Sequence, residues 1–198
     1  VVNYCYLNSG ACPTGAWGGN SSGLIESGNS SWGGLASPSP SAMAFVQRVG
    51  QLSQIFTATS SKQVRLVWQE ADRPNPNRGG QTYIVAVNGT SVGTYTSSGT
   101  GFRQRISDTF SLVSGEPYVI TFTGQMNDAD RSGLIDSIRL ITANDGAIEY
   151  SYDALGRLVS KTSIGGVNAD ATATYCYDAA DNRTRVVGKN DGLLGSCP

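Results

Sequence analysis

The stretch QTYIVAVNGTSVGTYT, from Gln81 to Thr96, decides how the middle of this chain folds. Its two flanks, Gln81–Val87 and Gly93–Thr96, are rich in β-branched and aromatic residues, which favour extended strands. Between them stands Asn88-Gly89, a dipeptide that tolerates the positive φ angles of a two-residue hairpin turn. We therefore predict an antiparallel β-hairpin centred on Asn88-Gly89.

Similar short runs, separated by turn residues, extend on both sides of this hairpin from Leu24 to Ile141. The clearest is Pro117–Thr123, in which Tyr118, Ile120 and Phe122 alternate with residues of the opposite face. The other expected strands are Ala42–Arg48, Leu52–Ala58, Val64–Glu70, Arg103–Phe110 and Leu134–Ile141. No stretch shows a helical period. Eight short strands at even spacing predict an all-β fold, a jelly-roll β-sandwich.

The two ends of the chain have different patterns. Residues 1–23 are rich in Gly, Ser and Asn and show no period, so we expect a loop-rich N-terminal arm. The jelly roll then spans residues 24–142. In residues 143–198 the pair Tyr152-Asp153 recurs 25 positions later as Tyr177-Asp178, each time followed by turn residues and a second strand-like run. This last segment predicts two β-hairpins and a tail.

Composition excludes several classes of function. Charged residues make up 15% of the 198 and the net charge is −1, so a nucleic-acid partner is not expected. No apolar run is long enough to span a membrane. The chain has no histidine, the commonest general base, and no G-x-S-x-G nucleophile motif, so we expect no enzyme. It starts at Val1 without a signal peptide, which we interpret as a fragment or a mature secreted segment.

The four cysteines lie near the two ends of the chain, at Cys5, Cys12, Cys176 and Cys197. Their spacing does not suit a metal finger, and an even number suggests disulfides in an oxidising compartment, secreted or at the cell surface. Four cysteines allow three pairings. Closeness in sequence favours Cys5 with Cys12 and Cys176 with Cys197, whereas four free thiols are the alternative.

Two loops, residues 70–80 and 125–133, carry clustered polar residues. The loops of a jelly roll gather at its ends, so these two can lie close together. A sugar needs an aromatic ring for its apolar face and hydrogen-bonding groups for its hydroxyls. The candidate carbohydrate-binding residues are Trp32, Asp72, Arg73, Asn77, Arg78, Asp128, Asp130 and Arg131. Trp17 and Trp32 stand among glycines, where a ring can be exposed or can cap the sandwich, whereas Trp68 alternates with apolar residues and is expected in the core. The alternative is a pair of solvated loops without a ligand.

Four segments, taken in order, resemble the galactose-binding-like jelly roll shared by many carbohydrate-binding modules. They are GLIESG (Gly23–Gly28), VGQLSQIFTA (Val49–Ala58), the hairpin quoted above, and YVITFTG with SGLIDSIRL (within Tyr118–Leu140). The resemblance implies a glycan or polysaccharide partner and one structural Ca²⁺, held by Glu26 and Asp136. The stretch from Asp128 to Asp136 also matches most of an EF-hand loop, but Arg139 replaces the bidentate Glu, so Ca²⁺ on Asp128 and Asp130 is only an alternative.

The C-terminal pattern Y-x-Y-D-x-x-G-R-L resembles the YD repeat of the RHS proteins. The first copy matches at Tyr150, Tyr152, Asp153, Gly156, Arg157 and Leu158; the second keeps Tyr175, Tyr177, Asp178 and Arg183. Asp181-Asn182 stands where Gly is expected, and Asn tolerates a left-handed backbone. In that family long arrays form a β-shell around a cargo, which implies that these hairpins dock on the rest of their own repeat-containing chain. Two unrelated hairpins are the alternative.

These observations predict a non-catalytic carbohydrate-binding or adhesion module of a larger secreted or cell-surface protein with RHS/YD repeats. The alternative is a structural spacer or plug domain of an RHS-type shell that binds no ligand. An exposed aromatic ring at a loop end, with Arg and Asp around it, favours the first function. Burial of Trp17, Trp32 and Trp68 favours the second.

Overall fold

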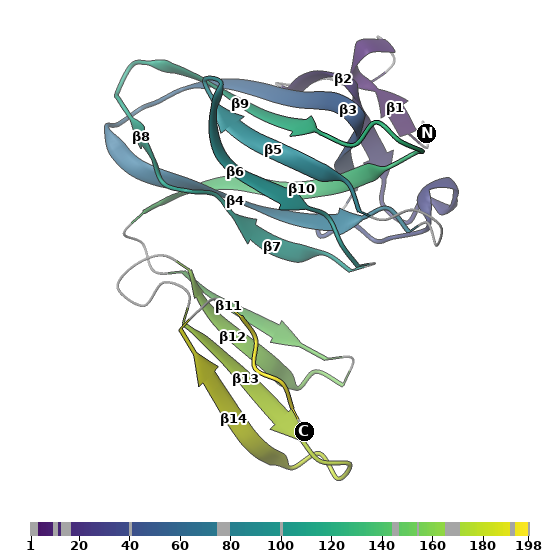
Figure 1. Cartoon of the computed structure of the whole chain (residues 1–198), viewed down its shortest axis with the longest axis vertical. Coiled ribbons are helices and arrows are strands. Elements are labelled where there is room, and N and C mark those ends of the chain that lie inside the picture. The colour runs from purple at the N-terminus through teal and green to yellow at the C-terminus, as the bar shows by residue number, and fades with distance from the viewer. Residues whose placement is uncertain are drawn as a thin grey trace. The chain divides into compact units, whose positions relative to one another are not determined.

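The computed structural model describes residues 4–9, 12, 17–39, 41–74, 80–99, 101–143, 147–153, 155–164, 171–190 and 193–197. The chain divides into two compact units (Figure 1). Unit one runs from Val1 to Leu140 and unit two from Ile141 to Pro198, so the division falls two residues before the expected one.

Unit one is an all-β structure with two short 3₁₀ turns, η1 (Leu7–Ser9) and η2 (Ser30–Trp32). Its strands are β1 (Tyr4–Tyr6), β2 (Trp17–Glu26), β3 (Ala42–Thr57), β4 (Lys62–Asp72), β5 (Thr82–Val87), β6 (Thr90–Thr96), β7 (Arg103–Ile106), β8 (Phe110–Leu112), β9 (Pro117–Gly124) and β10 (Ser132–Thr142). Hydrogen-bonded neighbours follow the order β6-β5-β9-β3-β10-β4-β7; β2 also pairs with β3, β1 with β2, and β8 with β4.

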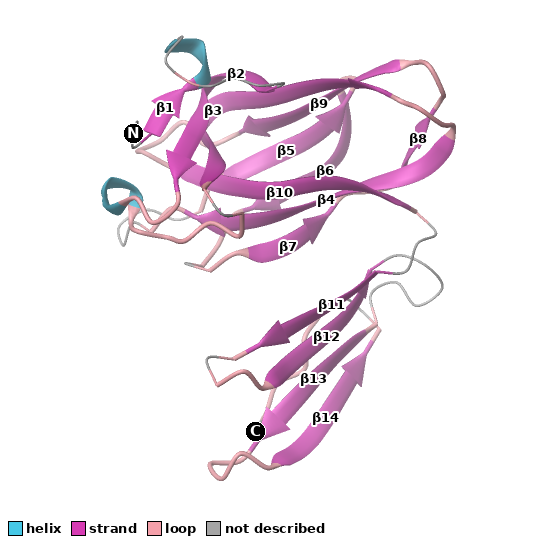
Figure 2. Ribbon diagram, turned by 180° about the vertical axis from the view of Figure 1, so that it is seen from behind, coloured by secondary structure: helices cyan, strands magenta, loops and turns pink. Residues whose placement is uncertain are grey.

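Strand β3 belongs to both layers of unit one. Its first half pairs with β10, where Phe45 lies opposite Leu134, and its second half pairs with β9, where Leu52 lies opposite Phe122. The strand turns from one layer to the other near Arg48, whose φ is 52°. Figures 1 and 2 show the resulting curled antiparallel sheet from its two sides. The predicted all-β sandwich is confirmed in this form.

Two predicted strand boundaries are wrong. The runs Ala42–Arg48 and Leu52–Ala58 are one continuous strand, because the chain bends at Arg48 without leaving the ladder. The run Arg103–Phe110 is two strands, β7 and β8. It is interrupted because the Asp108 amide donates to the Val92 carbonyl of β6, at 2.8 Å, instead of continuing along β4.

The predicted hairpin is strands β5 and β6. Val87 lies opposite Thr90, which leaves Asn88 and Gly89 as the two loop residues, with φ angles of 49° and 80°. Positive φ at both positions defines the type I′ turn, whose twist matches that of the flanking strands. The Asn88 side chain also accepts a hydrogen bond from the Val119 amide at 2.7 Å, which ties the hairpin to β9.

Side chains from both layers meet in one core. The fully buried members include Trp68, Leu52, Leu66, Tyr83, Phe122 and Ile135. Trp68 is 0% exposed, which confirms its predicted place in the core. Its indole N–H donates to the Tyr83 hydroxyl at 2.9 Å, so the polar atom of this large side chain is satisfied inside the core.

A buried carboxylate, Glu70, continues this polar chain and was not anticipated. It is 0% exposed, accepts a hydrogen bond from the Tyr83 hydroxyl, and pairs with Arg103 at 2.7 Å and Arg105 at 2.9 Å. Burial, followed by the Glu70 charge, raises the pKa of Tyr83 far above its usual range. Both arginines also donate to the Thr96 carbonyl, so edge strand β7 is bound to edge strand β6.

We expected a loop-rich N-terminal arm, but part of it forms strands. Trp17–Glu26 forms the ten-residue β2, and Tyr4–Tyr6 forms β1, with Cys5 opposite Leu24. The Cys5–Cys12 disulfide closes this region, as predicted. The sequence did not reveal these strands because their glycines and serines have low β-propensity. Pairing of β1 with β2, and of β2 with β3, holds them in extended form.

Unit two is a four-stranded antiparallel sheet in chain order. Its strands are β11 (Ala147–Tyr152), β12 (Leu158–Ile164), β13 (Thr172–Tyr177) and β14 (Arg183–Lys189). They form the two predicted hairpins. In the first turn, the Asp153 carboxylate accepts backbone N–H groups of Leu155 and Arg157, each at 3.0 Å. The Arg157 side chain returns to Asp153 at 2.6 Å, and Gly156 has a φ of 78°.

The second turn repeats this geometry with different residues. Asp178 accepts the amides of Ala180 and Asn182, each at 2.9 Å, and Asp181 takes the left-handed position with a φ of 66°. Asn182 is thus the equivalent of Arg157, because each follows its aspartate by four residues. Matching Arg183 to Arg157 was therefore wrong by one position.

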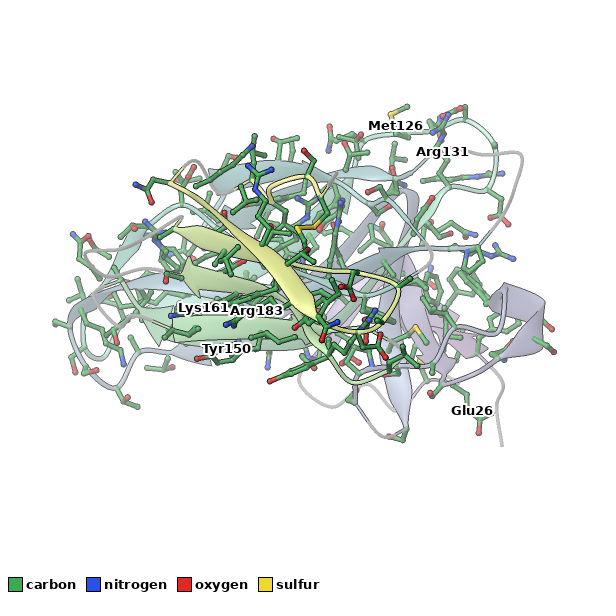
Figure 3. The ribbon with its side chains drawn as sticks, turned by 90° about the horizontal axis from the view of Figure 1, so that it is seen from below. Glu26, Met126, Arg131, Tyr150, Lys161 and Arg183 are labelled. Carbon is green, nitrogen blue, oxygen red and sulfur yellow. A yellow bond between two sulfur atoms is a disulfide. The ribbon has the colours of Figure 1, made fainter. Side chains whose placement is uncertain are left out.

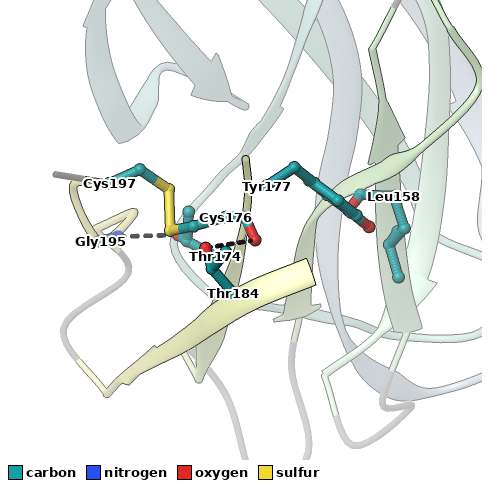
Figure 4. The surroundings of a disulfide bond; sticks show 7 residues. All are labelled: Leu158, Thr174, Cys176, Tyr177, Thr184, Gly195 and Cys197. Atoms are coloured by element: carbon teal, nitrogen blue, oxygen red, sulfur yellow. Dashed lines mark hydrogen bonds between the residues drawn. A yellow bond between two sulfur atoms is a disulfide. The ribbon is translucent and has the colours of Figure 1, made fainter. Parts of the chain in front are cut away.

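The C-terminal tail is tied to β13 on one face of this sheet, and Figure 4 shows its disulfide and the Gly195 hydrogen bond. The predicted Cys176–Cys197 disulfide anchors it, the Gly195 amide donates to the Thr174 hydroxyl at 2.8 Å, and Thr172 donates to the Leu193 carbonyl at 2.6 Å. On the other face Tyr150 lies opposite Lys161, and Figure 3 shows both labelled beside Arg183. Tyr150 is 49% exposed there.

In the described part of the chain the helices are the two three-residue 3₁₀ turns, and none could cross a lipid bilayer.

Candidate functional site

The two polar loops of unit one meet, as the sandwich topology predicts. Arg73 follows β4, and Asp130 lies in the connection between β9 and β10, 57 positions away. Their side chains form an ion pair at 2.5 Å, and the Arg73 amide donates to the Ser132 carbonyl at 3.2 Å. The Arg73 side chain is 17% exposed and that of Asp130 is 36% exposed. The pair therefore lies at the surface but is partly shielded from water.

Trp32 is beneath this ion pair and is not an exposed sugar platform. It is 5% exposed, and its ring lies 4.6 Å from that of Phe45. The Arg73 guanidinium covers it, with 4.2 Å between the guanidinium carbon and the ring centroid. Of the two alternatives for Trp32, the structure shows the ring that caps the sandwich, because Arg73, which follows β4, occupies its outer face in a cation–π contact.

The exposed ring at this end is Tyr4, which the sequence did not single out. It is 43% exposed, and its ring centroid lies 5.6 Å from that of Trp32. Only the pairing of β1 with β2 brings it here, and the sequence signal for that strand was too weak to find.

Two further polar residues complete the group. The Gln47 amide donates to Asp130, and its carbonyl oxygen accepts the Tyr6 hydroxyl at 2.7 Å. Burial, with the Asp130 charge as the second cause, raises the pKa of Tyr6. The loop-end cluster is therefore made of Tyr4, Tyr6, Trp32, Gln47, Arg73 and Asp130.

Asp72, Asp128 and Arg131, three further predicted site residues, have other partners. Arg131 forms an ion pair with Asp128 at 2.9 Å, donates to the Gly80 carbonyl at 3.1 Å, and is labelled at the loop's edge in Figure 3. Asp72 accepts the Ser97 hydroxyl at 3.1 Å, and burial raises its pKa. Asn77 and Arg78 lie outside the described residues.

The expected Ca²⁺ ligands do not gather at one site. Glu26 is exposed and points away from the body of the unit (Figure 3), and no described contact joins it to Asp136. Asp136 is buried and accepts the hydroxyls of Ser37 at 2.6 Å and Ser39 at 2.7 Å, as well as the Ser137 amide at 2.6 Å. The described residues hold no group of three or more His, Cys, Asp or Glu side chains suited to a metal. Ca²⁺ binding stays a prediction.

The chemistry of the loop-end cluster suits ligand recognition. It offers an exposed phenol ring, a planar guanidinium with several donors, and a carboxylate that accepts hydrogen bonds. Each charged group is already paired, so a ligand must exchange its own hydroxyl or carboxylate for an existing partner. Weak and reversible binding follows from such an exchange.

No protein-family profile matches this chain, and no curated protein matches it. Among solved structures, a family 35 carbohydrate-binding module from Clostridium thermocellum is 17% identical, with a TM-score of 0.48, covering 67% of this chain and 96% of that one. A family 61 module in complex with β-1,4-galactotriose is 13% identical, with a TM-score of 0.47 and coverages of 65% and 90%. An adhesin domain of Lys-gingipain from Porphyromonas gingivalis is 12% identical, with a TM-score of 0.46, covering 64% of this chain and 90% of that one. Since these TM-scores are below 0.5, the fold of unit one is assigned from its own strand order and core.

Proposed function

We propose that the chain is a non-catalytic carbohydrate-binding or adhesion module of a larger secreted or cell-surface protein. Unit one supplies the glycan site at its loop-end cluster. Unit two is a pair of YD hairpins that continues into an RHS-type repeat array. The two disulfides are consistent with an extracellular setting.

One observation carries the glycan site. An arginine and an aspartate from loops far apart in sequence converge beside an exposed tyrosine, at the end of a rigid sandwich. Arg73 is held in place by Trp32 beneath it and by the Ser31 carbonyl at 3.2 Å. A positioned guanidinium loses little entropy when it binds a ligand, and its fork matches a pair of hydroxyls or a carboxylate. Glycans with an acidic sugar are therefore the preferred ligands.

The test is a glycan panel of neutral and acidic oligosaccharides, followed by calorimetric titration of the hits. We expect dissociation constants on the order of 0.01–1 mM, because a shallow polar site buries little apolar area. Arg73→Ala should weaken binding at least tenfold. The matched control is Arg65→Ala, which removes a guanidinium bonded to Thr109 elsewhere on unit one. No titration signal across the panel at millimolar ligand would reject the glycan site.

A specific observation supports the alternative, a spacer domain without a ligand. Trp32 and Trp68 are both buried, and the charged groups of the loop-end cluster satisfy one another. In that case Arg73→Ala should lower the melting temperature of unit one and leave every glycan measurement unchanged. The same variant thus separates the two functions.

A further inference from the structure

A second concave site lies elsewhere on unit one, where β2, β3 and β10 meet. It is a cavity of about 360 Å³. This volume falls within the range of pockets that hold small organic molecules, about 300–1,000 Å³. Its apolar lining comes from Trp17, Leu24, Ala44 and Ile138, which also contact the main core. Neither polar loop contributes to it.

A β-bulge makes the wall of this cavity. The register of β2 on β3 shifts between Asn20 and Ser22, and Ser21 has a φ of 42°. Residues on one strand face alternate with period two, so Trp17 and Leu24 would otherwise point to opposite sides. The register irregularity, in which Ser21 alone stands against residues 47–50 of β3, places both in the lining of the same cavity. Such bulges commonly redirect a side chain next to a functional site.

The polar groups of the cavity are available to a ligand. Gln54 lies directly opposite Trp17 in the register, so the indole and the amide share one face. Among the described residues, neither the Gln54 amide nor the Trp17 indole N–H has a hydrogen-bond partner, and the same holds for the Ser137 hydroxyl. Ser137 itself has a φ of 52°, a conformation that costs energy outside glycine and tends to occur at functional sites.

The electrostatics of the cavity exclude an anionic ligand. Its lining contains no Lys or Arg and one carboxylate, Asp136, whose oxygens already accept bonds from Ser37, Ser39 and Ser137. Asp136 therefore holds Ser37, Ser39 and Ser137 in place beside the cavity, and its charge repels an anion. The hydrogen-bonding groups left for a ligand are those of Gln54 and Ser137. This is the reverse of the loop-end cluster, where an arginine favours acidic sugars.

We propose that this cavity binds one neutral sugar ring, such as the end of a glycan chain, against the Trp17 indole with hydrogen bonds to Gln54 and Ser137. The ring's apolar C–H face meets the indole, and its hydroxyls satisfy the free amide and hydroxyl. The inference rests on the proposed carbohydrate-binding function but uses a separate site of opposite charge preference. A protein with both sites would hold a chain's neutral end and an acidic sugar independently.

The experiment titrates the full chain with methyl glycosides of galactose, glucose, mannose and N-acetylglucosamine, with glucuronic acid as the acidic comparison. Trp17 is the half-buried indole of unit one, whereas Trp32 and Trp68 are buried, so acrylamide quenching of tryptophan fluorescence, which acts first on accessible indoles, reports on the cavity. We expect at least one neutral glycoside to bind at millimolar concentration and glucuronic acid to leave this signal unchanged. Ala44→Leu fills the cavity floor with hydrocarbon and should weaken that binding at least tenfold.

Two further variants keep the test decisive if Ala44→Leu folds poorly. Gln54→Leu keeps the side-chain size, removes the amide, and should weaken neutral-sugar binding at least tenfold. Arg65→Ala, which removes a guanidinium bonded to Thr109 outside both sites, should leave neutral-sugar binding unchanged. If no neutral glycoside binds, or if it binds equally well to Ala44→Leu and Gln54→Leu, the cavity proposal is overturned. Arg73-dependent binding of acidic glycans would in that case still support the loop-end site.

Discussion

The two units of this chain keep β-sheets folded by different means. Unit one has a continuous core of aliphatic and aromatic side chains, many of them fully buried, with Glu70 bound inside it. In the described part of unit two the buried side chains are Ser160, Thr172, Thr174 and Cys176. Several of its large apolar residues, including Tyr150, Leu155 and Val186, are instead about half exposed or more.

The difference shows that a regular sheet does not imply a hydrophobic core. Unit two replaces a core by turn carboxylates, a tail hydrogen-bonded across one face, and a disulfide. Burial of apolar area is the dominant favourable term in folding, so unit two should be the less stable unit and should depend on each of these few contacts. The chain's three tryptophans all lie in unit one, so fluorescence follows unit one separately.

The largest effect is expected in unit one from Glu70→Gln. The change removes a charge that binds two arginines and a tyrosine in the core, and breaking such a buried pair costs about 3–5 kcal/mol. Urea unfolding followed by tryptophan fluorescence measures it. Glu116→Gln, at an exposed position, is the control and should change the unfolding free energy by less than about 0.5 kcal/mol. If Glu70→Gln lowers the unfolding free energy by less than about 1 kcal/mol, the apolar core, and not the buried ion pair, provides the stability of unit one.

The next effect is expected in unit two from the double variant Cys176→Ser/Cys197→Ser. Opening a loop of this length removes about 3 kcal/mol of stabilisation, which is a large share for a unit with so few buried side chains. Hydrogen exchange resolved by peptide should show lost protection across β13 and β14, with β5 and β9 unchanged. The matched control, Cys5→Ser/Cys12→Ser, should affect β1 and β2 only. Unchanged protection of β13 in the first variant would mean that the tail is not a structural clamp.

Sequence reasoning succeeded where the determining contacts are local. The Asn88-Gly89 turn, the Asp153 and Asp178 turns and both disulfide pairings involve residues close in sequence, so propensity and spacing were sufficient. The positions of several strands of unit one also followed from short apolar runs between turn residues.

Sequence reasoning failed where long-range pairing decides the environment of a side chain. Arg73 covers Trp32 from 41 positions away, and Tyr4 reaches the same end only through β1 and β2. Glu70 was expected only as the last residue of a strand, because nothing local shows that Arg103, Arg105 and Tyr83 surround it. Strand β1 could have been predicted only if the arm had fewer glycines or a clearer alternation of apolar and polar residues.

A smaller effect is expected from acid and from Asp153→Asn. Hydrogen bonds from the Arg157 backbone are the main cause that lowers the pKa of Asp153, and bonds from the Asn182 backbone do the same for Asp178. A lowered folded-state pKa stabilises the fold above the unfolded value, about 3.9, and this stabilisation is lost as pH falls through the folded value. Unit two should therefore lose protection below about pH 4, before unit one.

Asp153→Asn should reproduce part of that loss at pH 7, seen as faster amide exchange in β11 and β12. Leu155→Ala is the control, because that side chain in the same turn is 71% exposed. If both variants exchange like the natural chain, the turn carboxylates do not stabilise the hairpins.

The smallest effect is expected from calcium. An ion that binds the native state alone raises the melting temperature, but here Asp136 already has serine and backbone partners and Glu26 points elsewhere. We expect only a slight rise in the melting temperature of unit one between EDTA and millimolar CaCl₂. An identical melting temperature in both solutions would show that Ca²⁺ does not bind the native protein. A rise above about 5 °C would show that Asp136 gives up its hydrogen bonds to Ser37 and Ser39 and binds the ion instead.

The path of β3 has a consequence for how unit one transmits force. Because the first half of this single sixteen-residue strand pairs with β10 and its second half with β9, the two layers are joined through one backbone. A force applied to one layer therefore passes to the other through covalent bonds near Arg48 and not through side-chain packing alone. Unit one is in this sense mechanically coupled across its two layers.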